Sequence, residues 1–106
     1  MITFDEWLKI DIRIGEIKKA EKIEGADKLL KLEVDLGNES KQLVAGIAEY
    51  YKPEEIIGKK IPVLVNLEPK KLRGVESQGM ILCAVDGDVP VLLEPEKDVP
   101  TGTKVR

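Results

Sequence analysis

The chain has 106 residues, a formal net charge of −3 and no histidine. This length suits one domain with a single modest core, and 42% apolar with 35% charged residues is a globular composition, not a disordered one. Without histidine the chain lacks the commonest transition-metal ligand and general base, so we expect no metal, no cofactor and no enzyme activity. No apolar run approaches the length of a membrane span, and no signal peptide precedes the first strand, which together predict a cytoplasmic protein that does not bind membranes.

A short helix is predicted from Thr3 to Leu8. Thr3 and Glu6 have the spacing of a capping box, in which each side chain bonds the other residue's backbone N–H. Phe4 and Trp7 share one face of this helix because they lie three residues apart. That apolar face either caps the core or forms a contact with a second copy of the chain.

Strands are predicted wherever apolar and polar residues alternate. The first begins at Ile10, and its apolar phase flips to Ile17 after Gly15, which predicts a bulge or a sharp bend within one long strand. Cys83 lies within an apolar strand and is expected to pack as a small hydrophobe. Further strands are predicted at Leu30–Leu36, Gln42–Ile47, Ile61–Val65, Met80–Val85 and Val89–Leu93.

A second helix is predicted within Ala48–Ile57, where Pro53 suits the start and Gly58 the end. The order is therefore three strands, a short helix and two strands, with a short N-terminal helix and extra strand at the C-terminus. This all-β pattern predicts the OB-fold, a five-stranded barrel, and leaves a plain β-sandwich as the alternative. OB-folds bind oligonucleotides on strands 2 and 3 and with the loops joining strands 1–2 and 4–5. Here those loops are Glu24–Lys28 and Leu67–Gly79.

Positive charge is concentrated next to the second of these loops. Five basic residues and one acid lie between Lys59 and Arg73, whereas three basic and six acidic residues follow Gly74. A local basic site on an acidic body can bind RNA while avoiding other polyanions. The alternative is a solvated loop with ordinary surface charges.

Neutral polar residues in the same loop favour the RNA-binding interpretation. Asn66, Ser77 and Gln78 offer donors and acceptors for base edges or the 2′-hydroxyl. Asn66 is one of only two asparagines, and a purely structural loop would have no need of Gln78-Gly79 at the mouth of a strand. We therefore expect this loop to contact nucleic acid.

The loop sequence resembles a known family. The tRNA-binding domain at the C-terminus of methionyl-tRNA synthetases, found also in endothelial-monocyte-activating-polypeptide-like and free-standing tRNA-binding proteins, has a pattern close to Asn-Leu-Lys-Pro-x-Lys-Leu-Arg-Gly-x-x-Ser-x-Gly-Met. The residues here that match it are Asn66, Leu67, Pro69, Lys71, Leu72, Arg73, Gly74, Ser77, Gly79 and Met80. Further matches are Asp11–Gly15, Ala26–Leu29, Val34–Gly37, Pro53–Lys59 and Pro100–Val105. Departures occur at Ile23-Glu24-Gly25, at Ala45 and at Glu68, where the family often has His-Pro, serine and lysine respectively.

The resemblance implies a non-catalytic domain that binds tRNA by its shape, with little sequence preference, as an auxiliary domain or subunit of methionyl-tRNA synthetase. It also implies a homodimer to which the terminal segments contribute, with Phe4, Trp7 and Leu8 as candidate contacts, and a partnership with the synthetase's catalytic chain. The expected RNA-binding residues are Arg13, Lys28, Lys31, Gln42, Asn66, Lys70, Lys71, Arg73, Ser77, Gln78 and Met80.

Two other functions compete with this one. A dimeric, chaperone-like member of the same fold family would bind peptides and would need an apolar groove. An enzyme is disfavoured because no carboxylate is paired with a nucleophile at a telling spacing. Only four aromatic residues are present, and none lies on a predicted strand of the binding face. Recognition of a folded RNA through its backbone is therefore favoured over stacking of single-stranded bases.

Overall fold

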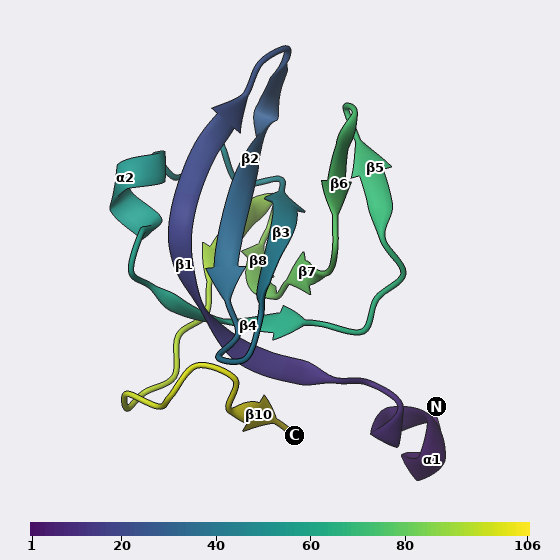
Figure 1. Cartoon of the computed structure of the whole chain (residues 1–106). Helices are drawn as coiled ribbons and strands as arrows, with labels where there is room; N and C mark the ends of the chain where they lie inside the picture. The colour runs from purple at the N-terminus through teal and green to yellow at the C-terminus, as the bar shows by residue number, and fades with distance from the viewer.

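A computed structural model describes all 106 residues. Strands dominate, and the two helices are short (Figure 1). The elements in chain order are α1 (Phe4–Leu8), β1 (Ile12–Ile23), β2 (Ala26–Asp35), β3 (Ser40–Ala45), α2 (Pro53–Ile56), β4 (Lys60–Leu64), β5 (Lys70–Leu72), β6 (Val75–Ser77), β7 (Met80–Ile81), β8 (Cys83–Asp86), β9 (Val89–Leu92) and β10 (Lys104–Val105).

Strand β1 is long because it changes partner midway. Residues up to Glu16 pair with β4, and residues from Glu16 onward pair with β2. The change of partner comes at Glu16, directly after Gly15, where the sequence predicts a bulge or sharp bend. The pairing with β4 runs through Gly15 without a break in register, and a side chain at this position would collide with Val34. The register irregularity itself falls slightly later, between Ile17 and Lys19.

The main sheet has the order β3-β2-β1-β4-β7, with all pairs antiparallel and α2 between β3 and β4. This is the OB-fold arrangement that the sequence predicts. The alternation along β2 explains the core, because Leu30, Leu32 and Val34 point inward and are at most 1% exposed. Full burial of such a side chain stabilises the fold by about 1.5–3 kcal/mol. Cys83 packs against this core as expected.

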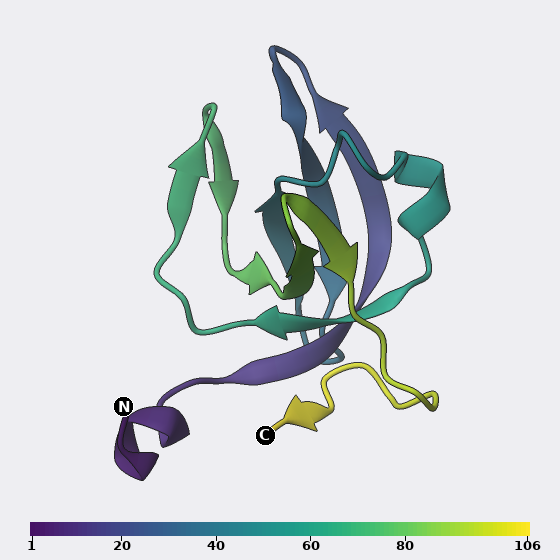
Figure 2. The ribbon, with the colours of Figure 1, turned by 180° about the vertical axis from the view of Figure 1, so that it is seen from behind.

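Three predicted elements are corrected by the structure. The strand expected at Met80–Val85 divides at Leu82, because β7 pairs with β4 whereas β8 turns away to pair with β9, in front of the main sheet in the view of Figure 2. The helix expected at Ala48–Ile57 shrinks to α2, since a turn closed on the Ile47 carbonyl precedes it. The loop Leu67–Gly79 is not irregular but contains the β5–β6 hairpin.

Helix α1 stands away from the barrel in both views (Figures 1 and 2). The predicted capping box is present: the Thr3 hydroxyl accepts from the Glu6 N–H, and the Glu6 carboxylate accepts from the Thr3 N–H. No residue of α1 is buried, and Phe4 and Leu8 are 72% and 63% exposed. The helix therefore does not cap the core. No helix of the chain has both the length and the hydropathy to cross a membrane.

Candidate nucleic-acid interface

The β5–β6 hairpin ends in a strained two-residue turn. Arg73 and Gly74 both have positive φ, 53° and 79°, which is the type I′ geometry favoured in tight hairpins. Arg73 is the only residue other than glycine with a positive φ in the chain. A side chain in this conformation costs roughly 1–2 kcal/mol. The turn therefore holds a guanidinium at the hairpin tip at a cost to stability.

This tip lies beside the connection between β1 and β2. Arg73 lines one shallow groove together with Gly25–Leu29, and the two hairpins point the same way from the barrel (Figure 1). The structure thus brings together Lys28 and Arg73, which the sequence assigned to the two loops of the binding face. Lys22, which the sequence analysis did not select, lies near the end of β1 in the same region and makes no ion pair.

A set of side-chain hydrogen bonds fastens the hairpin to β3, and we call this set the β3 seam; its members are Gln42, Val44, Glu76, Ser77 and Gln78. The Ser77 hydroxyl accepts from the Val44 N–H at 3.0 Å and donates to the Gly79 carbonyl at 2.8 Å. The Gln78 carbonyl Oε1 accepts from the Gln42 N–H at 2.9 Å, and Gln42 Nε2 donates to the Glu76 carbonyl at 2.8 Å. One backbone bond, from the Gln78 N–H to the Gln42 carbonyl, completes the seam and joins β3 to the segment before β7.

The start of the loop is held by Asn66. Its Oδ1 accepts from the Asp11 N–H at 2.9 Å, and its Nδ2 donates to the Lys9 carbonyl. Asn66, Ser77 and Gln78, predicted as RNA contacts, therefore already bond main-chain groups of the protein. The expectation that a structural loop would not need Gln78-Gly79 is wrong, since Gln78 belongs to the seam and a Cβ on Gly79 would lie 2.7 Å from the Leu64 carbonyl oxygen.

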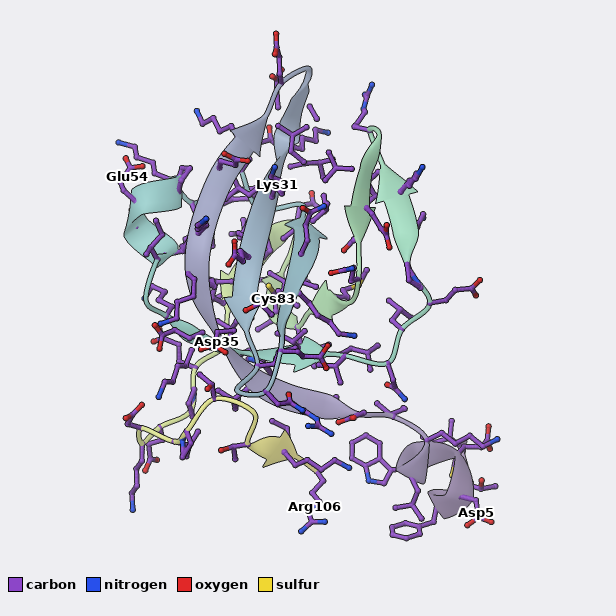
Figure 3. All side chains as sticks on the ribbon, viewed as in Figure 1. Asp5, Lys31, Asp35, Glu54, Cys83 and Arg106 are labelled. Carbon is purple, nitrogen blue, oxygen red and sulfur yellow. The ribbon has the colours of Figure 1, made fainter.

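Cations on the outer face of β1 and β2 are paired with acids. Lys31 bonds Glu21 across the two strands at 2.6 Å, and Lys19 lies 3.6 Å from Glu33. The hydrogen bond from Lys31 lowers the pKa of the Glu21 carboxyl. Lys31 was predicted to contact RNA and lies on this face (Figure 3), but its charge is compensated.

Cations near the tips of the β1–β2 and β5–β6 hairpins, in contrast, are not paired with acids. Lys59 and Lys60 also belong to the basic stretch of the sequence, but they lie elsewhere and pair with Glu94 and Asp98. The remaining candidates make no ion pair and are exposed. We call them the hairpin cations: Lys28, Lys70, Lys71 and Arg73.

Arg13 lies apart from this group. It sits in the half of β1 that pairs with β4 and β10, and its guanidinium bonds both carboxylate oxygens of Asp11, at 3.0 and 3.1 Å. This hydrogen bond, opposed by partial burial, holds the pKa of Asp11 below its usual value. Since Asn66 bonds the backbone of Asp11, Arg13 lies near the base of the loop and Arg73 at its tip. The predicted cluster is therefore split along the length of the loop.

Apolar and aromatic groups offer little for stacking on bases. Met80 is 48% exposed at the start of β7, beside the base of the loop. No aromatic residue lies on β2 or β3, and Tyr51 packs against the core with its hydroxyl accepting from the Leu92 N–H. Burial raises the pKa of the Cys83 thiol, which keeps it protonated at neutral pH. The site therefore offers fixed positive charge and no stacking platform.

Comparison with known proteins decides the family. Residues 12–104 match the family described as "putative tRNA binding domain". The chain belongs to this family. The methionine–tRNA ligase of Pyrococcus furiosus is 53% identical over 105 residues, which cover 99% of this chain and 14% of the ligase. That of Thermotoga maritima is 51% identical over 104 residues, covering 98% of this chain and 16% of the ligase. The chain therefore spans about one-seventh of the length of these relatives.

Solved structures share the fold over the whole chain. A MetRS-related protein from Pyrococcus horikoshii superposes with a TM-score of 0.94 at 46% identity and covers 100% of this chain and 98% of its own. The chaperone CsaA from Bacillus anthracis gives 0.91 at 36% identity and covers 100% and 99%. Two kinds of relative thus share one architecture, and the fold alone does not choose between them.

Proposed function

We propose that this domain binds tRNA, and that it does so chiefly through the phosphate backbone at the tips of the β1–β2 and β5–β6 hairpins. The observation that carries the proposal is that the hairpin cations are exposed and unpaired in a member of the tRNA-binding family, whereas the neighbouring sheet face is neutralised. Lysine and arginine contacts to phosphate position a protein on RNA without reading its sequence. Binding should therefore depend on RNA shape more than on sequence.

The absence of aromatic residues from β2 and β3 supports a folded RNA as the ligand. OB-folds that bind single strands use aromatic side chains as stacking platforms, each worth about 1–3 kcal/mol per base. This domain has no such platform on its face. A fluorescence anisotropy titration should show tRNA binding more tightly than an unstructured RNA of equal length, and equal affinity for both would contradict the proposal.

We further propose a non-catalytic, auxiliary role beside a methionyl-tRNA synthetase. The support is that the matched relatives are methionine–tRNA ligases of which this domain corresponds to about one-seventh. An attached tRNA-binding domain raises the effective concentration of tRNA near the catalytic site. Adding this chain to the catalytic chain should lower the KM for tRNA without changing kcat, provided the two associate.

The exposed helix α1 supports the proposal of a homodimer. Its apolar residues Phe4 and Leu8 are largely exposed, and Trp7 is only half-buried. An exposed apolar helix of this kind marks an interface. Light scattering at micromolar concentration should give twice the chain mass, and Phe4→Ser with Leu8→Ser should give the monomer. A monomeric mass for the wild type would refute this proposal.

A peptide-binding function is the second candidate, because CsaA chaperones match this chain over its full length. One groove of the chain has apolar lining, contributed by Ile14, Pro62, Leu93, Val99 and Val105. This groove lies on β1, β4 and the C-terminal segment, away from the hairpin tips. Competition between tRNA and an unfolded peptide in one assay separates the two candidates, and preferential peptide binding would favour the chaperone.

A further inference from the structure

We propose that Gln42, Ser77 and Gln78 are positioning residues, which hold the β5–β6 hairpin at a fixed angle to β3 so that Arg73 and its neighbouring lysines reach the RNA. This inference rests on the proposed tRNA binding. In this inference the three residues promote RNA binding by holding the hairpin in place, whereas the sequence predicts that they contact the RNA directly.

Each of these residues already uses a side-chain hydrogen-bonding group within the protein: Gln42 its Nε2, Gln78 its Oε1 and Ser77 its hydroxyl. Ser77 is 5% exposed, and its hydroxyl both accepts from Val44 and donates to Gly79. A hydroxyl has one donor, so Ser77 has none left for RNA, and its burial denies access to the remaining lone pair. No buried side-chain nitrogen or oxygen in the chain lacks a partner. The buried part of the seam is thus complete without a ligand.

The hairpin needs such a fastening because it is small and outside the main sheet. Each of its strands has three residues, and they pair only with each other. An isolated two-stranded hairpin is marginally stable in water. Apart from one backbone bond, the side chains of Gln42, Ser77 and Gln78 make the hydrogen bonds that join it to β3.

A fixed hairpin lowers the cost of binding. If the hairpin could swing, its cations would have to be ordered each time they met phosphate, and that ordering would subtract from affinity. The seam also gives the strained turn at Arg73 a purpose, because the turn sits on a hairpin that is held in place. A guanidinium presented at a tip is directed toward RNA only when the strands beneath it are held.

A double-mutant cycle tests this role. Ser77→Ala should weaken tRNA binding by roughly tenfold, because it releases the hairpin and leaves the Val44 N–H without its partner. In an Arg73→Asn background the same substitution should cost about threefold or less, since only Lys70 and Lys71 are left for the seam to position. A tenfold loss in both backgrounds would show that Ser77 acts on the RNA independently, and would overturn the inference.

Amide hydrogen exchange provides a second readout without RNA. Ser77→Ala should speed exchange at Val44 and at residues 70–77 while leaving β1 and β2 protected. Ser40→Ala is the control, because it removes a hydroxyl that makes no hydrogen bond and lies on β3, the strand to which the hairpin is fastened. Unchanged exchange in the hairpin of Ser77→Ala would also overturn the inference.

Two further experiments distinguish a failure of this inference from a failure of the proposed tRNA binding. If Ser77→Ala fails to fold, Gln42→Ala tests the same seam, since it removes only the part-exposed bond to the Glu76 carbonyl. It should loosen the hairpin and weaken tRNA binding with the same dependence on Arg73. If wild type binds no tRNA, the proposed function fails, and the exchange experiment still decides whether the seam holds the hairpin.

Discussion

The outer face of β1–β2 and the β5–β6 hairpin carry similar numbers of basic residues but differ in what surrounds them. On the sheet face, Lys19 and Lys31 each lie opposite an acid on the neighbouring strand. At the hairpin, Lys71 lies opposite Glu76 but forms no ion pair with it, and Lys70 and Arg73 have no acid opposite them. Cross-strand pairing stabilises the sheet slightly and removes its attraction for phosphate, so counting lysines overstates the sheet face as a binding site.

The comparison also explains how an acidic domain can bind RNA. A net charge of −3 repels RNA at long range, but charge screening restricts that repulsion to about 8–10 Å at physiological salt. Within that distance the exposed hairpin cations are the charges that we expect to attract an RNA phosphate. We therefore expect binding to be local, and variants that alter the local charge should reveal it.

The largest effect should come from removing the hairpin's charge. The triple variant Lys70→Gln, Lys71→Gln, Arg73→Asn should weaken tRNA binding by roughly a hundredfold or more, because each charged hydrogen bond contributes about 1.5–3 kcal/mol. Fluorescence anisotropy at one salt concentration checks this, with circular dichroism to show that the barrel is folded. A folded triple variant with wild-type affinity would place the RNA elsewhere.

Arg73→Asn alone should separate stability from function. Asparagine tolerates positive φ, and Asn-Gly is the preferred sequence of a type I′ turn, so the variant should gain about 0.5–1 kcal/mol of stability. It should nevertheless bind tRNA roughly tenfold more weakly, through loss of a charged phosphate contact. Thermal melting and a binding titration on one sample test both, and a fall in melting temperature would contradict the turn argument.

The sheet face should gain affinity when its acids are neutralised. Glu21→Gln with Glu33→Gln frees Lys31 and Lys19 from their partners. tRNA binding should strengthen by about two- to fivefold, since exposed ion pairs are weak and the released charges sit beside the hairpin. Isothermal titration calorimetry measures the change. An unchanged affinity would mean that RNA does not approach this face.

The smallest effect concerns the base of the loop, where Arg13 pairs with Asp11. Because Arg13 holds the pKa of the Asp11 carboxyl below its usual value, the pair contributes stability above the unfolded pKa, about 4, that is lost as the pH falls through the lowered folded value. Asp11→Asn should therefore reduce the stability slightly at pH 7 and by less at pH 3. Urea denaturation at the two pH values checks this, and an equal loss at both would contradict it.

Much of the architecture could be predicted from the sequence because the alternation of apolar and polar residues indicates which side chains are buried. The apolar residues of β2 appear at every second position, and the capping box of α1 is readable from Thr3 and Glu6 alone. The division of the strand at Leu82 could not be read, because both halves are apolar and only their partners differ. The β5–β6 hairpin was missed because three-residue strands show too little alternation.

The site was harder to predict than the fold because the sequence does not show which charged or polar side chains have partners within the protein. Lys31 and Lys71 are indistinguishable in sequence, yet only Lys31 is paired. Asn66 and Ser77 have the polar groups of RNA contacts, but long-range backbone partners occupy them. One signal was available: Arg73-Gly74 between Leu72 and Val75 has the form of a two-residue turn.

The most direct test compares two variants that each lose two positive charges. Lys71→Gln with Arg73→Asn removes them from the hairpin, and Lys19→Gln with Lys31→Gln removes them from the sheet face. Each phosphate contact contributes about 0.7–0.9 to the slope of log affinity against log salt concentration. The hairpin variant should lose about 1.5 units of that slope and the face variant almost none. Equal losses in the two variants would show that overall charge, and not the unpaired cations of the hairpin, attracts the RNA.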